Sequence, residues 1–357
     1  MGRQSGIEMT ASEVSVFHKT LDAILVAKIR IHGNVRDLPA AFAKLNRTVG
    51  DYANGSPIVI HHWGVSSEED RHDMDVCVPI TQAVKGNEVS EVTLPAEEAM
   101  VSIHRGPYSE IDLTYTKISR YTYERGHPIA ESTREVFHQL NEEMPEETVV
   151  EIQVILHDWT KRFATKLGAV LGHGIKEKVL APMNALDIDT SAEDRQKALC
   201  KALRTLEDNS NADQQSEILS HCAHVYPVEL IPPMRNLFRS TRDIDAVINA
   251  MVSRGGYYPK LLKREGSVIY SKKGPANPAL YKEAKTDAER RKAYCFCPLI
   301  RNCLEEAPRI FCNCAAGWPK QLWEGILERP LRIDITQSLT NGDNECEFAI
   351  HLPEDLL

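Results

Sequence analysis

The alternation of hydrophobic and polar residues in the first part of the chain predicts a strand, a helix and two further strands. Residues 23–32 alternate with the period of a strand, and residues 38–52 carry apolar side chains at helical spacing. Residues 57–63 and 73–80 follow as two strands on either side of an acidic turn. This stretch is therefore predicted to form one strand-helix-strand-strand unit.

A second unit of the same order follows directly. Residues 99–104 predict its first strand, and an apolar stripe over residues 111–118 predicts its helix. The pattern over residues 132–141 predicts an inserted helix, and residues 148–156 predict the closing strand.

A short motif supports the duplication. Residues 52–58 and 123–129 share the frame Tyr-x-x-Gly-x-Pro-Ile. A repeat of this length is a duplicated supersecondary unit, and two such units can pair into one sheet. We therefore predict an α+β fold, with a duplicated β-α-β-β antiparallel sheet, both helices on one side, and a groove along the pseudo-twofold axis.

Each copy carries an acid inside its last strand, Asp75 in the first and Glu151 in the second. A carboxylate among apolar strand residues is costly unless it is paired, hydrated or used. Alternation places Glu151 on the face opposite Val150 and Ile152. Two interpretations stay open, a solvent-facing acid or an acid that faces a ligand groove. In the second, the groove would bind an apolar or cationic ligand and would also be lined by the aromatic residues Trp63, Tyr108, Tyr115 and Tyr123.

Three segments of the repeat have the order and spacing of a known family. They are His-Arg-Gly-Pro-Tyr at residues 104–108, the helix end Tyr-Glu-Arg-Gly-His-Pro at 123–128, and the closing strand at 148–154. In these segments the chain resembles the GyrI-like domain, the effector-binding domain of AraC-type and multidrug-sensing regulators. The resemblance covers residues 20–157 and implies a small-molecule-binding domain there.

The resemblance also implies roles for particular residues. In that family the acid of the final strand faces the binding cavity and contacts cationic ligands, which carries over to Glu151. Some stand-alone members resemble hydrolases of cyclopropane-type electrophiles. The alternative function is therefore hydrolysis, with Glu151 as base or nucleophile and Tyr108 or Tyr115 as proton donor. One departure is that two valines separate Thr148 from Glu151, where the family has a tighter Thr-Glu pair.

Residues 158–285 are predicted to form a helical connector, because apolar stripes at helical spacing recur through them. Their sequence contains no helix-turn-helix pattern with a short glycine turn and a basic recognition helix. His221, Cys222 and His224 offer metal-ligating atoms, although such residues on an apolar helix are more often part of the packing.

Nine cysteines are present, and they cluster towards the C-terminus. Two Cys-x-Cys pairs, Cys295 with Cys297 and Cys312 with Cys314, have the number of thiolates that zinc prefers. Buried free cysteines and reactive, ligand-facing thiols are equally open interpretations. The zinc interpretation requires extended backbone, because in a helix residues i and i+2 point about 200° apart.

Residues 286–357 are predicted to form a small, cysteine-rich α+β domain with a helix at 321–328 and strands at 330–336 and 346–352. Its Cys-x-Cys-x-x-Gly-Trp segment, its Gly-Asp turn and its Cys-Glu-Phe strand resemble the vinyl-4-reductase-like and TRAPP-like ligand-binding domains over residues 295–353. That resemblance implies a small-molecule pocket or a dimer surface.

Charge and hydropathy exclude several classes of function. The 357-residue chain has a net charge of -9, which argues against direct nucleic-acid binding, because phosphate binding needs a basic face. It has no apolar run of about 18 residues, the length that a membrane span needs. The N-terminal residues lack the apolar core of a signal peptide. We therefore expect a cytoplasmic protein with no membrane association.

From these observations we infer a small-molecule-binding protein that senses or sequesters an apolar or cationic compound. Because no DNA-binding module is apparent, a regulatory output would need a dimer or a separate regulatory partner. The alternatives are the hydrolase described above and a zinc or reactive-thiol protein that acts through its C-terminal cysteines.

Overall fold

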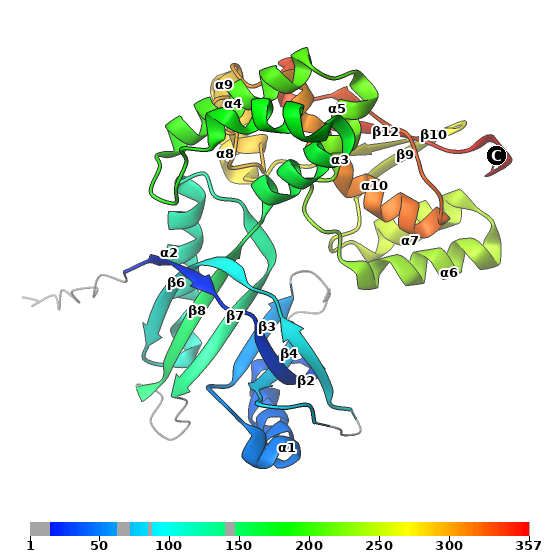
Figure 1. Ribbon diagram of the computed structural model, residues 1–357. Helices are drawn as coiled ribbons and strands as arrows, with labels where there is room; N and C mark the ends of the chain where they lie inside the picture. Colours follow the sequence, from blue (N-terminus) through cyan, green and yellow to red (C-terminus); the bar gives the residue numbers. More distant parts are fainter. Residues whose placement is uncertain (1–14, 63–71, 85–87, 140–146, 357) are drawn as a thin grey trace, which may run out of the picture.

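The computed structural model describes residues 15–62, 72–84, 88–139 and 147–356. Its first part is one curled antiparallel sheet, drawn in blue to green in the lower half of Figure 1. The strands of this sheet are β1 (Phe17–Leu21), β2 (Ile24–Gly33), β3 (Ile58–His62), β4 (His72–Pro79), β5 (Ser90–Leu94), β6 (Glu97–Arg105), β7 (Ile129–Gln139) and β8 (Val149–Leu156).

The strand order confirms the predicted duplication. The sheet runs β1-β6-β8-β7-β3-β4-β2-β5, so that the two halves mirror one another about the β7–β3 pair. Each strand of one half has its counterpart at the equivalent place in the other. The adjacent strands are antiparallel throughout.

Helices α1 (Leu38–Val49) and α2 (Ile111–Glu124) cover one face of this sheet, as predicted. Both are amphipathic, and their buried stripes pack against alternate residues of the central strands. The resulting core includes Leu45, Ile118 and Ile152, none of which is exposed to solvent. In Figure 1, α1 lies by β2 and β4 at the bottom of the picture, and α2 lies by β6 and β8.

The helix predicted for residues 132–141 is wrong over residues 132–139, because these residues belong to the central strand β7, and residues 140 and 141 lie outside the described residues. Thr133, Glu135 and Phe137 are all buried, and so is Arg134 between them. Both faces of β7 carry buried polar side chains that have hydrogen-bond partners. The segment therefore lacks the simple apolar-polar alternation that marks a strand. Tertiary pairing with β3 and β8 therefore decides the structure of this segment.

The second part of the chain is mainly helical and ends in a four-stranded sheet of order β11-β12-β10-β9. Its helices are α3 (Trp159–Leu180, interrupted at Gly172, φ 77°), α4 (Ala192–Asp208), α5 (Ala212–Ser220), α6 (Ile231–Thr241), α7 (Ile244–Arg254), α8 (Pro278–Glu283), α9 (Asp287–Tyr294) and α10 (Asn313–Leu327). Its strands are β9 (Leu261–Glu265), β10 (Val268–Lys272), β11 (Ile333–Gln337) and β12 (Glu347–His351).

This second part does not divide into separate cores at residue 285. The β9–β10 hairpin lies in the predicted connector, yet β10 pairs with β12 of the predicted C-terminal domain. One hydrophobic cluster joins α3, α4 and α5 to residues 294–311, and another joins α6 and α7 to α10. The predicted boundary therefore falls inside shared cores.

Helix α10 approaches α5 very closely at Gly317. A Cβ atom at this position would lie 2.1 Å from the backbone oxygen of Ser220 and 2.6 Å from the Cβ of Ala223. Only glycine allows this packing distance. Within the described residues, no helix is long and apolar enough to cross a membrane.

Candidate functional site

A buried carboxylate surrounded by hydrogen-bond donors lies between the sheet and its helices. Glu135 is on β7, only 1% exposed, and pairs in register with Val59 of β3 and Ile152 of β8. Tyr108, in the short turn before α2, donates to its Oε2 at 2.7 Å, and Tyr115 of α2 donates to its Oε1 at 2.8 Å.

Further groups complete this cluster. His61 of β3 places its Nε2 3.1 Å from Glu135 Oε1. The ring of Phe137 stacks on Tyr108 with centroids 5.9 Å apart and meets Phe42 edge-on at 5.7 Å. One carboxylate is thus held by two phenol hydroxyls and an imidazole beside an aromatic wall. We call Glu135, Tyr108, Tyr115 and His61 the Glu135 cluster.

The contacts within the cluster keep Glu135 ionised. Burial alone would raise the pKa of this carboxyl, but His61 and the two tyrosine hydroxyls offset that effect, so that the pKa lies below its ordinary value. Burial and the adjacent carboxylate raise the pKa of both tyrosines, which therefore stay protonated and donate. A negative charge is in this way held in an apolar interior.

Sequence reasoning identified Tyr108 and Tyr115 but missed Glu135. Residues 132–141 were predicted to be helical, and the acid predicted to face the ligand was Glu151 of the closing strand. The signal that was available is the alternation Thr133, Glu135, Phe137, which places Glu135 on the same face as an aromatic ring.

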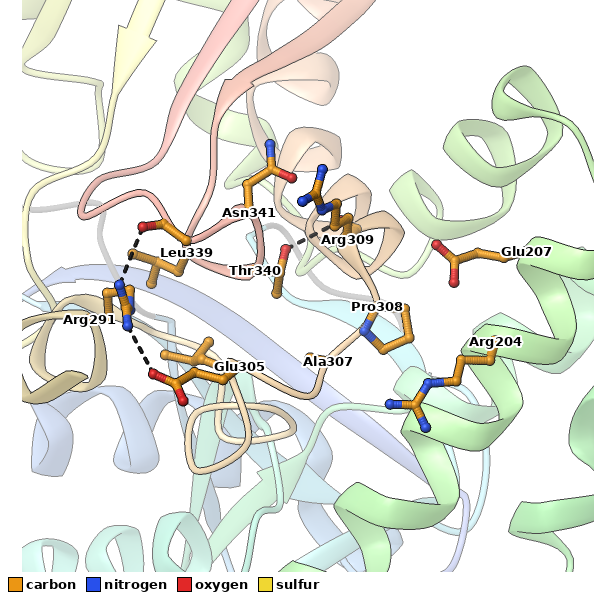
Figure 2. A pocket seen from close by; sticks show the side chains of 12 residues that line it. Arg204, Glu207, Arg291, Glu305, Ala307, Pro308, Arg309, Leu339, Thr340 and Asn341 are labelled. Carbon is orange, nitrogen blue, oxygen red and sulfur yellow. Dashed lines mark hydrogen bonds and ion pairs between the residues drawn. The ribbon is translucent and has the colours of Figure 1, made fainter. Parts of the chain in front are cut away.

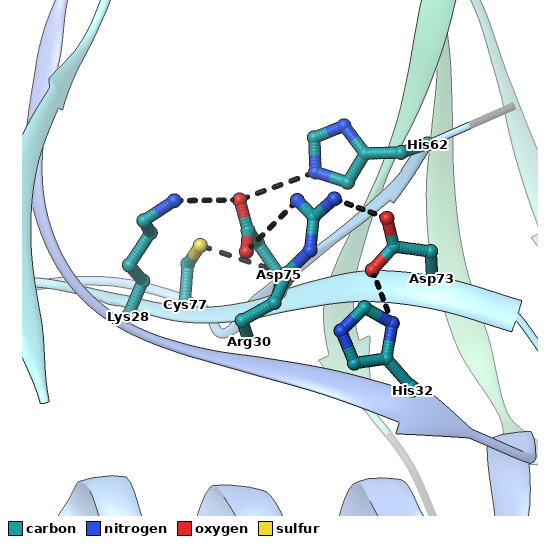
Figure 3. Close-up of polar contacts among 7 residues, drawn as sticks. All are labelled: Lys28, Arg30, His32, His62, Asp73, Asp75 and Cys77. Atoms are coloured by element: carbon teal, nitrogen blue, oxygen red, sulfur yellow. Dashed lines mark hydrogen bonds and ion pairs between the residues drawn. The ribbon is translucent and has the colours of Figure 1, made fainter. Parts of the chain in front are cut away.

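Asp75 lies on the other face of the sheet, away from α1 and α2. Its Oδ2 accepts from Lys28 Nζ at 2.8 Å, and Arg30 Nη1 lies 3.3 Å from its Oδ1. His62 Nε2 approaches at 3.1 Å, and Arg30 also binds Asp73 (Figure 3). Burial raises the pKa of Asp75, but these partners outweigh burial and hold it well below its usual range.

Glu151 shares this face with Asp75. It is 7% exposed, its Oε1 accepts from Lys19 Nζ at 2.7 Å and from Gln153 Nε2 at 2.6 Å, and His138 lies 3.8 Å away. Because Glu151 pairs with Val136 while Glu135 pairs with Ile152, the two glutamates are on opposite faces. The structure therefore does not bring Glu151 together with Tyr108 or Tyr115.

Of the remaining predicted aromatic residues, Tyr123 lies apart from the Glu135 cluster. Tyr123 receives a hydrogen bond from Arg301, whose guanidinium carbon lies 4.8 Å from the centre of the Tyr123 ring. This contact joins α2 to the second part of the chain. Trp63 lies outside the described residues.

The cysteines of the two Cys-x-Cys pairs all line one mostly apolar cavity of about 130 Å³ in the second part of the chain. Burial raises the pKa of Cys295 to about 12 and the pKa of Cys314 and of Cys346 to about 11. Cys295 has extended backbone, but Cys312 and Cys314 lie in helical turns. Within the described residues, the four thiols do not form a converged ligand group. The second pair thus lacks the extended backbone that zinc binding by all four cysteines requires, and such binding is kept only as a prediction for experiment.

A second hollow, of about 480 Å³, lies near the start of α10 and is rich in arginine (Figure 2). Arg204, Arg291 and Arg309 line it. Arg291 donates to Glu305 at 3.0 Å, so the hollow carries part of its own counter-charge. No feature of the sequence singled it out.

Comparison with known proteins identifies the first part of the chain. The sequence model of the GyrI-like small molecule binding domain matches residues 15–157. This region is therefore a GyrI-like small-molecule-binding domain, in agreement with the resemblance found at residues 20–157. No curated protein matches the chain.

Several solved structures are similar to this region. The C-terminal domain of EcmrR is 17% identical, covers 41% of this chain and 98% of its own, and has a TM-score of 0.37. A hydrolase from Listeria innocua is 12% identical, covers 42% and 95%, and has a TM-score of 0.32. SAV2435 bound to tetraphenylphosphonium is 13% identical, covers 42% and 97%, and has a TM-score of 0.29.

Proposed function

We propose that the GyrI-like domain binds an apolar organic cation at the Glu135 cluster, and that the protein senses or sequesters such compounds. The observation that carries this proposal is the chemistry around the buried charge. Among the described residues, the side chains that contact the Glu135 carboxylate are two phenols and an imidazole, and none is a lysine or arginine. A cationic ligand could supply the missing permanent positive charge.

The two acids predicted from the sequence differ in this respect. Asp75 is bound by Lys28 and Arg30, and Glu151 is bound by Lys19, so each already has a permanent counter-charge. A ligand would have to displace these ammonium and guanidinium groups. At Glu135 it would displace hydroxyl and imidazole donors, and the aromatic rings beside it offer cation-π contacts.

The geometry favours binding over hydrolysis. A general base works best when its pKa lies near the operating pH. The pKa of Glu135 and that of Glu151 are both lowered, because their hydrogen-bond partners outweigh the effect of burial. Neither carboxylate is therefore poised as a strong base.

The test is a calorimetric titration of the full chain with tetraphenylphosphonium, an apolar monocation, and with neutral triphenylphosphine oxide. We expect saturable binding of the cation and weaker binding of the neutral compound. Glu135→Gln should weaken cation binding roughly tenfold to 150-fold, the equivalent of losing one contact to a charged group. Glu151→Gln is the matched control and should leave the affinity unchanged.

Two results would contradict this proposal. One is loss of affinity in Glu151→Gln with normal affinity in Glu135→Gln, which would move the site to the other face of the sheet. The other is equal affinity of both variants and wild type, with circular dichroism showing all three folded.

A further inference from the structure

Three metal-ligating side chains converge where the GyrI-like domain meets the helical part. Glu131 is at the start of β7, His157 directly follows β8, and His224 lies between α5 and α6. Their ligand atoms all lie within 4.8 Å of one another. They form the one such group among the described residues. The Glu135 cluster contains none of them, and His224 lies outside the region that the family model matches.

A backbone carbonyl orients the ring of His157. His157 is 7% exposed, and its Nε2 lies 3.0 Å from the carbonyl oxygen of Cys222. A ring nitrogen facing a carbonyl must carry the hydrogen, so in the neutral imidazole Nδ1 presents its lone pair. Metal-binding histidines are commonly oriented by this kind of second contact.

Further hydrogen bonds position the Glu131 carboxylate and the backbone of His224. The backbone N–H of Val225 donates to Glu131 Oε1 at 2.6 Å, and Gln321 Nε2 donates to the carbonyl of His224 at 2.9 Å. The rings of His157 and His224 stack at 4.2 Å with an angle of 21° between their planes. The three side chains are therefore close together before any ion is present.

We propose that Glu131, His157 and His224 bind a divalent transition-metal ion such as zinc. Two imidazoles and one carboxylate form a zinc ligand set that leaves a coordination position open for water or a substrate. His224 also lines the thiol-bordered cavity described above, so the ion would border that cavity. The metal would also tie the GyrI-like domain to the helical part.

The simpler alternative is a purely structural contact. His224 Nδ1 lies 3.2 Å from Glu131 Oε1, and this hydrogen bond could by itself join the two parts of the chain. A contact of that kind needs no ion. The two interpretations differ in metal content and in the atoms that surround the metal.

The test uses the full chain, stripped of metal with a chelator under reducing conditions and given one equivalent of zinc. X-ray absorption should then show nitrogen and oxygen neighbours at about 2.0–2.1 Å, whereas cysteine binding would give sulfur at about 2.3 Å. Competition with a chromogenic chelator measures the affinity. We expect His224→Gln and Glu131→Gln each to weaken zinc binding by at least about tenfold, the lower end of the loss seen even for second-contact residues.

His221→Gln is the matched control, because His221 is exposed on the same segment and lies outside the group. It should bind zinc as wild type does. The proposal is overturned if wild type binds no zinc, if the absorption shows only sulfur neighbours, or if Glu131→Gln binds zinc with unchanged affinity. The absorption measurement on wild type decides the question even if a variant fails to fold.

Discussion

Removing the hydroxyl of Tyr115 should loosen the centre of the GyrI-like sheet. Tyr115→Phe keeps the ring and deletes one hydrogen bond to Glu135, whose Oε1 lies 2.8 Å from that hydroxyl. Because Glu135 is only 1% exposed, water cannot easily replace the lost donor. The loss of a hydrogen bond to a charged group costs about 1.5–3 kcal/mol.

The matched control is Tyr121→Phe on the same helix. Tyr121 stacks with Arg125, and among the described residues its hydroxyl has no hydrogen-bond partner. Its removal should change stability by less than about 0.5 kcal/mol. The Tyr115 hydroxyl also lies 3.3 Å from Thr133 Oγ1, so the difference between the two variants measures its contacts with Glu135 and Thr133 together.

Hydrogen exchange of the β7 amides, followed by mass spectrometry, measures this difference locally. A loss of about 1.5–3 kcal/mol corresponds to roughly tenfold to 150-fold faster exchange in Tyr115→Phe, at about 1.4 kcal/mol per factor of ten. Equal exchange rates in Tyr115→Phe and Tyr121→Phe would refute the reasoning, because the carboxylate would then not depend on the hydroxyl.

The pH dependence follows from the lowered pKa of Glu135. In the unfolded chain this carboxyl titrates near 4.3. The folded state holds its proton less tightly, so the contribution of the charged contact is fully present above the unfolded pKa. It is lost only as the pH falls through the lower, folded-state pKa. The difference between the variants should therefore stay constant from about pH 8 to pH 5 and narrow at more acidic pH.

Three further outcomes are expected. Gly317→Ala should lower the free energy of unfolding by about 1–3 kcal/mol in urea titrations, because the added Cβ would overlap the backbone oxygen of Ser220. Gly274→Ala is the control and should leave the free energy of unfolding nearly unchanged, because a Cβ there meets open space. In Asp75→Asn, the free energy of unfolding should fall less steeply as the pH is lowered. The pKa of Asp75 is lowered in the folded state, so its charged contacts stabilise the fold fully above about pH 4 and are lost at more acidic pH. Iodoacetamide should label Cys314 slowly at pH 7 and faster towards pH 11, because burial raises the pKa of this thiol. If zinc slows the labelling of both Cys-x-Cys pairs, the prediction of a four-cysteine zinc site is supported. Labelling that zinc does not change would contradict that prediction.

The sequence predicted the architecture of the first domain because its repeats are carried by periodic apolar residues. Strands β2 and β4 and helices α1 and α2 all follow their apolar patterns. Strand β7 does not, because its buried positions are filled by polar side chains whose partners come from other strands and from α2. Only tertiary contacts satisfy those groups, and a local pattern cannot reveal them.

The candidate site was predicted only in part for the same reason. Tyr108 and Tyr115 were predicted to line a ligand groove with Glu151, and the structure places both hydroxyls on Glu135. The acid predicted to lie beside these tyrosines was Glu151 of the closing strand. Glu151 pairs with Val136, the neighbour of Glu135, and therefore lies on the opposite face of the sheet. His157 and His224 are far apart in the sequence, and only the fold brings them to Glu131.

The two edge strands of the large sheet show how its halves are joined. β1 precedes the first unit but pairs with β6 of the second, and β5 precedes the second unit but pairs with β2 of the first. Each unit thus lends its leading strand to the other. A chain with a single unit would reach this eight-stranded sheet only as a homodimer with exchanged arms, so the present domain is a tethered form of such a dimer. Cutting the chain between β4 and β5 would leave two fragments, and each would carry the strand that completes the other.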